Sequence, residues 1–101
     1  RMSGAEANSY LVLASIISGI HYGIANKLLP DKPRTDNACE NPDEIMPKNI
    51  NQALKLLENS NILEEYFTKE YIELYVDLKR KEFNAFNDEI SDVEYKWYLN
   101  L

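Results

Sequence analysis

The apolar segment from Tyr10 to Ile24 constrains this chain most, because its roughly 15 residues contain no charged side chain. Apolar residues recur in it every three or four positions, which is the spacing of one face of an α-helix. A bilayer span needs about 20 predominantly apolar residues, so the segment is too short for a membrane anchor. We therefore predict a buried helix over residues 8–29, with Asn8 as its N-cap. Its main stripe comprises Tyr10, Leu13, Ala14, Ile17, Ile20, His21 and Ile24.

The same helix is predicted to be apolar nearly all round. A second apolar set widens the stripe and leaves only a narrow face of small residues. Such a helix is normally sandwiched between other elements, and a chain of 101 residues has little core to cover it. We expect the helix to need partners outside the chain, so that the isolated chain forms dimers or swapped pairs. The second set is Leu11, Val12 and Ile16, and the small face is Ser15, Ser18 and Gly19.

The rest of the chain divides into a connector and a helical array. Residues 30–48 contain all four prolines, which predicts a long irregular loop. Asn49 and Ser91 each open a capping-box pattern, and Thr68 is a plausible cap for the longest helix. Between them, Asn59-Ser60-Asn61 ends one helix and residues 62–67 form a short turn. No segment alternates with a period of two, so we predict a mostly α fold of four to five helices.

The longest helix, after Thr68, has one predicted apolar face, which a second set of residues widens. The face comprises Tyr71, Leu74, Tyr75, Leu78, Ala85 and Phe86, and the second set comprises Ile72, Val76 and Phe83.

Composition narrows the classes of function. The formal charge is −6, and such an acidic surface argues against nucleic-acid and peripheral-membrane binding. The single cysteine, Cys39, forbids an internal disulfide and favours a reducing, cytoplasmic location. The chain also opens on Arg1 without a starting methionine, from which we expect a fragment of a longer protein.

No active site can be assembled from the residues alone. His21 is the single histidine and has no metal-ligand partner at helical spacing, so we interpret it as a packed helix residue. Cys39 has no nearby histidine to activate it. The pairs Glu64-Glu65 and Asp88-Glu89 are sequence neighbours, which point in different directions on a helix and do not form an acid–base pair. We therefore name no catalytic and no metal-binding residue.

Two charged features remain. The cluster Lys79-Arg80-Lys81 is most simply an ion-pairing surface with neighbouring acidic residues such as Asp77, Glu82 and Glu73. Arg1 precedes a small-residue stretch before Asn8, where an arginine fork could hold a carboxylate or phosphoryl group.

The order of motifs resembles the last quarter of the glutamine synthetase superfamily's catalytic domain. The chain reads Arg1, then Gly-Ala-Glu-Ala-Asn-Ser-Tyr-Leu over residues 4–11, then Gly19-Ile20. Downstream, Lys-Arg-Lys-Glu over residues 79–82 and Glu-Tyr-Lys-Trp-Tyr-Leu over residues 94–99 continue the pattern, so that the resemblance covers residues 1–101. One departure is Ser9, which stands where the family has proline. The opening and closing motifs look more like gamma-glutamylpolyamine synthetases than ammonia-using glutamine synthetases.

The resemblance implies the helical C-terminal segment of an α+β catalytic domain. Its full-length parent would be an ATP-dependent ligase that uses Mg²⁺ or Mn²⁺, joins glutamate to ammonia or a polyamine, and forms a cytoplasmic homo-oligomer. Arg1 matches the family arginine that contacts the substrate's carboxylate or phosphoryl group. The metal ligands would lie upstream, so we expect the 101 residues alone to be inactive and to bind no cofactor. The alternative is a free-standing helical module that binds a partner protein through its apolar first helix.

Overall fold

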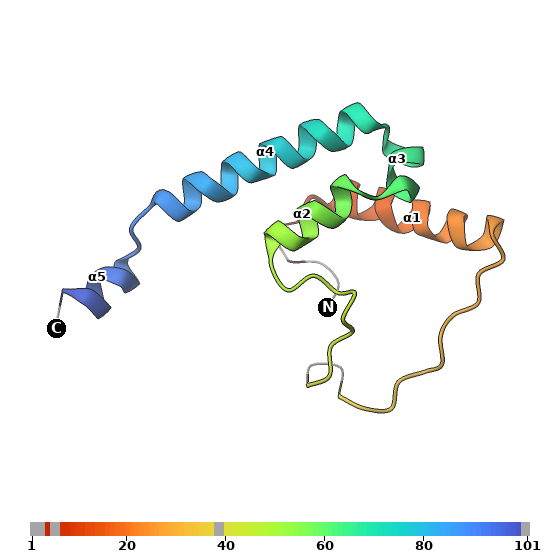
Figure 1. Ribbon diagram of the computed structural model, residues 1–101, viewed down its shortest axis with the longest axis horizontal. Helices are drawn as coiled ribbons and strands as arrows, with labels where there is room; N and C mark the ends of the chain where they lie inside the picture. The colour runs from red at the N-terminus through yellow and green to blue at the C-terminus, as the bar shows by residue number, and fades with distance from the viewer. Residues whose placement is uncertain (1–3, 5–6, 38–39, 100–101) are drawn as a thin grey trace.

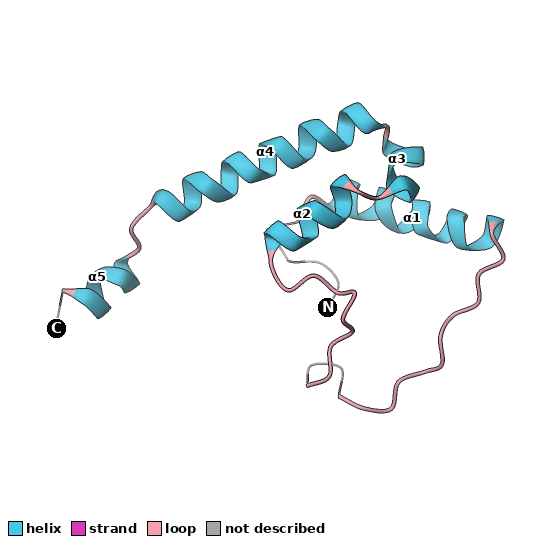
Figure 2. Ribbon diagram, in the orientation of Figure 1, coloured by secondary structure: helices cyan, strands magenta, loops and turns pink. Residues whose placement is uncertain are grey.

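The computed structural model describes residues 4, 7–37 and 40–99, and these residues form five α-helices without a strand. A long loop separates α1 from the other four helices (Figures 1 and 2). The predicted mostly α fold with four to five helices is confirmed. The helices are α1 (Ser9–Ala25), α2 (Ile50–Glu58), α3 (Asn61–Phe67), α4 (Lys69–Asp88) and α5 (Asp92–Tyr98).

Helix α1 begins as predicted and ends early. The Asn8 side chain accepts hydrogen bonds from the backbone N–H groups of Tyr10 and Leu11, so Asn8 is the N-cap. The predicted extension to residue 29 is wrong, because the helix stops at Ala25. Lys27 there takes a left-handed φ of 52°, and the N–H of Leu28 donates back to the Gly23 carbonyl at 2.9 Å. This is a Schellman ending, whose left-handed position is usually a glycine.

The connector that contains the four prolines is irregular, as predicted. Residues 27–37 and 40–49 contain no helix, which confirms the long irregular loop for the described part of the segment. Local hydrogen bonds give it short turns: Arg34 forms an ion pair with Asp36 at 2.6 Å, and the Ile45 N–H donates to the Asp43 carboxylate at 3.0 Å.

Side-chain caps begin the next two helices. Asn49 accepts a hydrogen bond from the Gln52 N–H at 3.0 Å, as predicted. The Gln52 side-chain oxygen accepts a hydrogen bond from the Lys48 N–H at 2.8 Å. A capping box would pair it with the N–H of the N-cap Asn49, one residue later. Ser60 caps α3, so the short turn predicted over residues 62–67 is a seven-residue helix.

Thr68 forms the corner between α3 and α4. It ends α3 and caps α4, as predicted, with φ 63° and ψ 152°. A β-branched residue in this region carries strain of about 1–3 kcal/mol, which the surrounding packing must offset. Beside the corner, the rings of Phe67, Tyr71 and Tyr75 stack along one edge, with centroids 5.9 and 6.3 Å apart.

The core lies between α2 and α4, with α3 closing one end. Its fully buried side chains are Leu54, Ile72 and Val76, and Val76 is 1% exposed. Leu74 and Phe86 of the predicted main face of α4 are exposed, whereas Tyr75 is half-buried. Of the residues that widened this face, Ile72 and Val76 pack into the core. Leu57, Leu63 and Phe67 line the periphery of this core.

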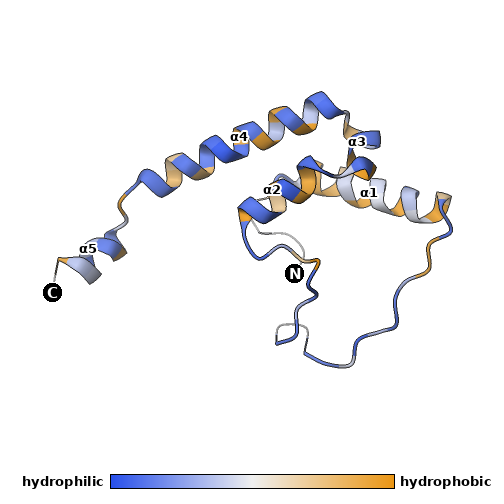
Figure 3. Ribbon diagram, in the orientation of Figure 1, coloured by the Kyte–Doolittle hydropathy of each residue, from blue (hydrophilic) through white to orange (hydrophobic). Residues whose placement is uncertain are grey.

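Helix α1 exposes most of its large apolar side chains instead of burying them. It contacts α3 on the side of Ser18, which is buried and whose hydroxyl donates to the Ala14 carbonyl at 2.8 Å. Most of the predicted apolar stripe is exposed, as expected of a helix that the chain has little core to cover, while His21 of the same stripe lies against α3. In Figure 3, α1 is mostly pale or orange along its length, whereas α4 carries strong blue between its orange positions. The exposed apolar residues are Tyr10, Leu13, Ile16, Ile17, Ile20 and Ile24.

The molecule is far from spherical. Its radius of gyration is 17.6 Å, against about 13 Å for a compact domain of this length. Its accessible surface is 9437 Å², against about 5,900 Å² for a compact protein of this mass. Helix α4 extends away from α1 and carries α5 at its far end (Figure 1). Among the described helices, none combines the length and the hydrophobicity needed to cross a bilayer.

Candidate functional site

The residue singled out as a substrate contact, Arg1, lies outside the described residues, as does Cys39. Between Arg1 and the start of α1, the structure describes Gly4, Ala7 and Asn8. The Ala7 N–H donates to the Gly4 carbonyl at 3.4 Å, which turns the chain just before Asn8. The Asn8 cap then fixes the backbone at the start of α1, with its side-chain oxygen 3.0 Å from the Tyr10 nitrogen. Ser9 occupies the first helical position, where a proline is also tolerated, so this departure from the family pattern leaves the helix start intact.

One side-chain hydrogen bond joins α1 to α3. The His21 Nδ1 lies 2.7 Å from the Tyr66 hydroxyl, and the two rings meet edge to face at 5.7 Å. Burial raises the pKa of Tyr66, with smaller contributions from Glu65 and Tyr22. The phenol therefore stays protonated at neutral pH and can donate to Nδ1. His21 was interpreted as a packed helix residue; its ring lies against Tyr66, and the residue is otherwise exposed.

The basic cluster on α4 forms ion pairs, as predicted. Lys79 contacts Glu82 at 2.6 Å, which raises the pKa of Lys79. Arg80 reaches across to α2 and holds Glu58 with both terminal nitrogens, at 2.7 and 3.3 Å. This fork raises the pKa of Arg80 and lowers that of Glu58. Two of the cluster's cations are thus engaged by carboxylates of this chain, and Arg80 serves to tie α4 to α2.

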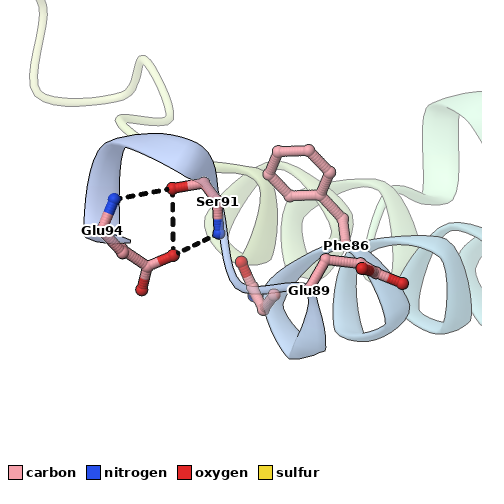
Figure 4. A pocket seen from close by; sticks show the side chains of 5 residues that line it. Phe86, Glu89, Ser91 and Glu94 are labelled. Carbon is pink, nitrogen blue, oxygen red and sulfur yellow. Dashed lines mark hydrogen bonds between the residues drawn. The ribbon is translucent and has the colours of Figure 1, made fainter. Parts of the chain in front are cut away.

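A shallow hollow lies at the corner between α4 and α5. It is lined by Phe86, Asn87, Glu89, Ser91 and Glu94. Figure 4 shows the Glu94 carboxylate turned toward Ser91, where it accepts from the backbone N–H at 2.8 Å and from the hydroxyl at 3.0 Å. This is the predicted capping box, and those hydrogen bonds lower the pKa of Glu94. The carboxylate therefore holds the start of α5 and is not poised for proton transfer.

The described residues supply no reaction centre of their own. Nowhere among them do three His, Cys, Asp or Glu side chains gather closely enough to hold a metal ion. These residues do not fit the divalent ions that the resemblance implies, and ligands for such ions would have to come from elsewhere. The described residues fix the backbone at the start of α1, and they do not form a reaction centre.

Sequence reasoning missed both contacts that tie the helices together. The partners His21 and Tyr66 are 45 residues apart, and Glu58 and Arg80 are 22 apart. No spacing rule connects residues on separate helices, because their distance depends on how the helices pack. An opposite-charge pairing between α2 and α4 is visible only once those helices are placed side by side.

Comparison with known proteins gives the chain its family. Residues 1–98 match the family described as glutamine synthetase, catalytic domain. The chain is 29% identical to type-1 glutamine synthetase 2 of Dictyostelium discoideum, over 100% of the chain and 20% of that protein. It is 32% identical to glutamate–isopropylamine ligase of a Pseudomonas species, over 100% of the chain and 23% of that protein.

It is also 32% identical to gamma-glutamylputrescine synthetase of Escherichia coli, over 98% of the chain and 21% of that protein. No solved structure matches the chain. The chain spans about a fifth to a quarter of the length of the curated relatives it matches. On this correspondence over residues 1–98, the chain belongs to the glutamine synthetase catalytic-domain family.

Proposed function

We propose that this chain is the C-terminal helical part of an ATP-dependent ligase that joins the side-chain carboxyl of glutamate to ammonia or an amine. The observation that carries the proposal is the family match over residues 1–98, in a chain that spans only about a fifth to a quarter of its relatives. The bare apolar face of α1 and the open, extended shape support it, because both are expected of helices that pack against a larger body.

Within the family, we favour an amine or polyamine substrate over ammonia. Two of the relatives are named for ligating isopropylamine and putrescine, at 32% identity each. The Gly-Ala-Glu-Ala-Asn stretch over residues 4–8 and the Glu-Tyr-Lys-Trp-Tyr-Leu ending over residues 94–99 favour the same subfamily. The substrate class and the ligase activity belong to the full-length protein.

In that protein, Arg1 is the residue of this chain that touches substrate. A guanidinium offers two parallel N–H donors to a carboxylate or phosphoryl group, and its charge stabilises negative charge on the transferring group. ATP would supply the phosphoryl group that activates glutamate, and Mg²⁺ or Mn²⁺ would neutralise its charge. The Asn8 cap fixes the backbone at the start of α1, eight residues along the chain from Arg1 at the first position. We expect the 101 residues alone to be inactive, because the metal ligands that the resemblance implies would lie upstream of Arg1.

The parent is a cytoplasmic homo-oligomer that binds neither nucleic acid nor membrane. The formal charge of −6 supports the last two points, because it repels phosphate backbones and anionic lipid. The competing interpretation of the bare α1 face is a free-standing interaction module, which does not explain the family match.

The test is an assay of the full-length protein with glutamate, ATP and a panel of ammonia, putrescine, spermidine and ethanolamine. We expect γ-glutamyl amide and phosphate to form, fastest with a polyamine. Replacing Arg1 by Gln should lower kcat/KM by about 10²–10³-fold, the usual loss of one charge-stabilising donor. Arg34→Gln is the matched control, because Arg34 is held by Asp36 in the loop, and it should leave the rate unchanged. No phosphate release with any acceptor would contradict the proposal.

A further inference from the structure

The contact between His21 of α1 and Tyr66 of α3 joins two helices through residues that are 45 positions apart in the chain. The Tyr66 hydroxyl lies 2.7 Å from the His21 Nδ1, and the two rings meet edge to face with centroids 5.7 Å apart. A neutral imidazole accepts through one ring nitrogen and donates through the other. When the phenol donates to Nδ1, the histidine proton is therefore on Nε2. A short hydrogen bond together with a ring contact restrains the direction of the two side chains as well as their distance.

Tyr66 belongs to the packed part of the molecule. Leu63, one turn earlier in α3, and Phe67, the next residue, both pack against the core between α2 and α4. Thr68 then ends α3 and caps α4. Helix α3 therefore keeps a set direction relative to α4, and Tyr66 presents its hydroxyl to α1 from an element that is itself held in place (Figure 1).

Helix α1 has few other means of keeping its direction relative to α3. It contains no Lys, Arg, Asp or Glu, so none of its side chains carries a permanent charge for an ion pair. The loop after it contains no helix over residues 27–37 and 40–49, so this part of the loop does not hold α1 at an angle to α2. Ser18 is buried on the side toward α3, but its hydroxyl donates to the Ala14 carbonyl of its own helix. The bond between His21 and Tyr66 is thus a polar contact that restrains the direction of α1.

A small change at His21 would be larger at the other end of α1. His21 lies twelve residues after Ser9, the first residue of the helix. At about 1.5 Å per residue, that separation is about 18 Å along the helix axis. A rotation of α1 by about 5° at His21 would therefore move the start of the helix by roughly 1.6 Å. A misplacement of about 1 Å at a reaction centre can lower a rate about 100-fold, so a movement of this size matters for catalysis.

We infer that the hydrogen bond between Tyr66 and His21 positions the start of α1, and through it the segment that begins at Arg1. The inference rests on the proposed function, which gives Arg1 its contact with substrate, and it adds that the direction of α1 decides how well that contact is made. Arg1 lies seven residues before Asn8, so a displacement of the helix start displaces the point to which its segment is attached. His21 and Tyr66 are positioning residues, which act through Arg1.

Removing the Tyr66 hydroxyl in the full-length protein tests the inference. Tyr66→Phe keeps the ring beside His21 and removes the hydrogen bond. We expect kcat/KM to fall about tenfold, less than for a fixed 1 Å misplacement, because the released helix still visits the correct direction. In an Arg1→Gln background the same substitution should cause no further loss, since the residue that the contact positions is already gone. Tyr71→Phe is the matched control, because it makes the same change on α4 in a ring that stacks on Phe67, and it should leave the rate unchanged.

Two results of this assay would overturn the inference. An equal loss in both backgrounds would give Tyr66 a merely structural role, and an unchanged rate in Tyr66→Phe would show that other contacts hold α1. The acceptor side gives a further check. His21→Leu removes the acceptor and should lower kcat/KM as Tyr66→Phe does, and the double variant should be no slower than either single variant. Additive losses would mean that the two side chains act separately, which also contradicts the inference.

A distance measurement separates this inference from the proposed function. In a background without other reactive cysteines, spin labels on Ser9→Cys at the start of α1 and on Lys69→Cys of α4 report the direction of α1 by pulsed EPR. Lys69 suits a label because its side chain is 67% exposed. We expect Tyr66→Phe to broaden the distribution of distances between the labels and Tyr71→Phe to leave it unchanged.

An unchanged distribution in Tyr66→Phe would overturn the inference. The measurement needs no ligase activity. A broadened distribution in a protein that forms no γ-glutamyl amide would therefore contradict the proposed function and leave the role of the contact in orienting α1 standing.

Discussion

Helices α2 and α4 bury their apolar side chains against each other, whereas α1 turns its apolar side outward. In the first region, Leu54 and Val76 meet in a small core, and Arg80 ties the two helices together through Glu58. In the second, α1 contacts α3 on the side of the buried Ser18 and through the hydrogen bond between His21 and Tyr66. The difference teaches that α2 and α4 cover each other's apolar side chains, whereas none of the described residues covers the bare face of α1.

Truncating one apolar side chain in each region should give the largest contrast. Leu54→Ala should lower the free energy of unfolding by about 2–5 kcal/mol, the range for a buried leucine. Ile17→Ala, on the bare face, should change it by no more than about 0.5 kcal/mol in this chain. Urea unfolding followed by circular dichroism measures both. Equal losses would show that α1 is as well packed as α4 and would remove the contrast between the two regions.

The bare face should also make the isolated chain self-associate weakly. Sedimentation velocity over a range of concentrations should detect dimers or swapped pairs that dissociate on dilution, because the contact area on α1 is small. Ile20→Asp should shift the equilibrium toward monomer by placing a charge within the contact. The matched control is Leu74→Asp, on the exposed side of α4. A monodisperse monomer at every concentration would count against the exposure of α1.

The end of α1 offers a smaller effect of opposite sign. Lys27 occupies a left-handed position that costs an L-residue about 1–2 kcal/mol, whereas glycine adopts it freely. Lys27→Gly should raise the free energy of unfolding by about 0.5–1 kcal/mol, after the greater entropy loss of glycine is subtracted. Lys32→Gly, in the loop without such a φ, is the control and should give no gain. A loss of stability in Lys27→Gly would mean that the lysine side chain is needed there.

The smallest expected effect concerns the ion pair between Arg80 of α4 and Glu58 of α2, which should be lost in acid. Arg80 holds the pKa of Glu58 below its ordinary value of 4.5, so the folded state binds its proton less readily than the unfolded state. The pair therefore stabilises the fold above about pH 4.5, and that contribution is lost as the pH falls through the lowered pKa. Glu58→Gln should be less stable than wild type at pH 7, and the gap should close in acid. Glu44→Gln, in the loop, is the matched control for the loss of one carboxylate, and a Glu58→Gln gap that stays the same at every pH would contradict this prediction.

Local signals in the sequence predicted local structure well. The caps at Asn8, Asn49 and Ser91 were predictable, because each makes its hydrogen bonds within three residues along the chain. The bareness of α1 was also predictable, since no arrangement of so few residues could cover a helix that is apolar on nearly every side. The long loop followed from its prolines.

Packing between helices could not be predicted in the same way. On α4, Leu74 and Ile72 belong to different faces, and both faces are apolar enough to be buried. The position of α2 decides between them, which is why Leu74 of the predicted main face proved to be exposed. The early end of α1 was missed because its left-handed residue is Lys27 rather than the usual glycine. The role of Arg1 stays a prediction.

A structure of the full-length protein at atomic resolution tests the central claim most directly, through the exposed fraction of α1. Ile17 and Ile24 are 55% and 74% exposed in the chain alone. We predict that both are buried in the full-length protein, where α1 packs against the rest of the catalytic domain. Exposed fractions unchanged from those of the chain alone would contradict the account.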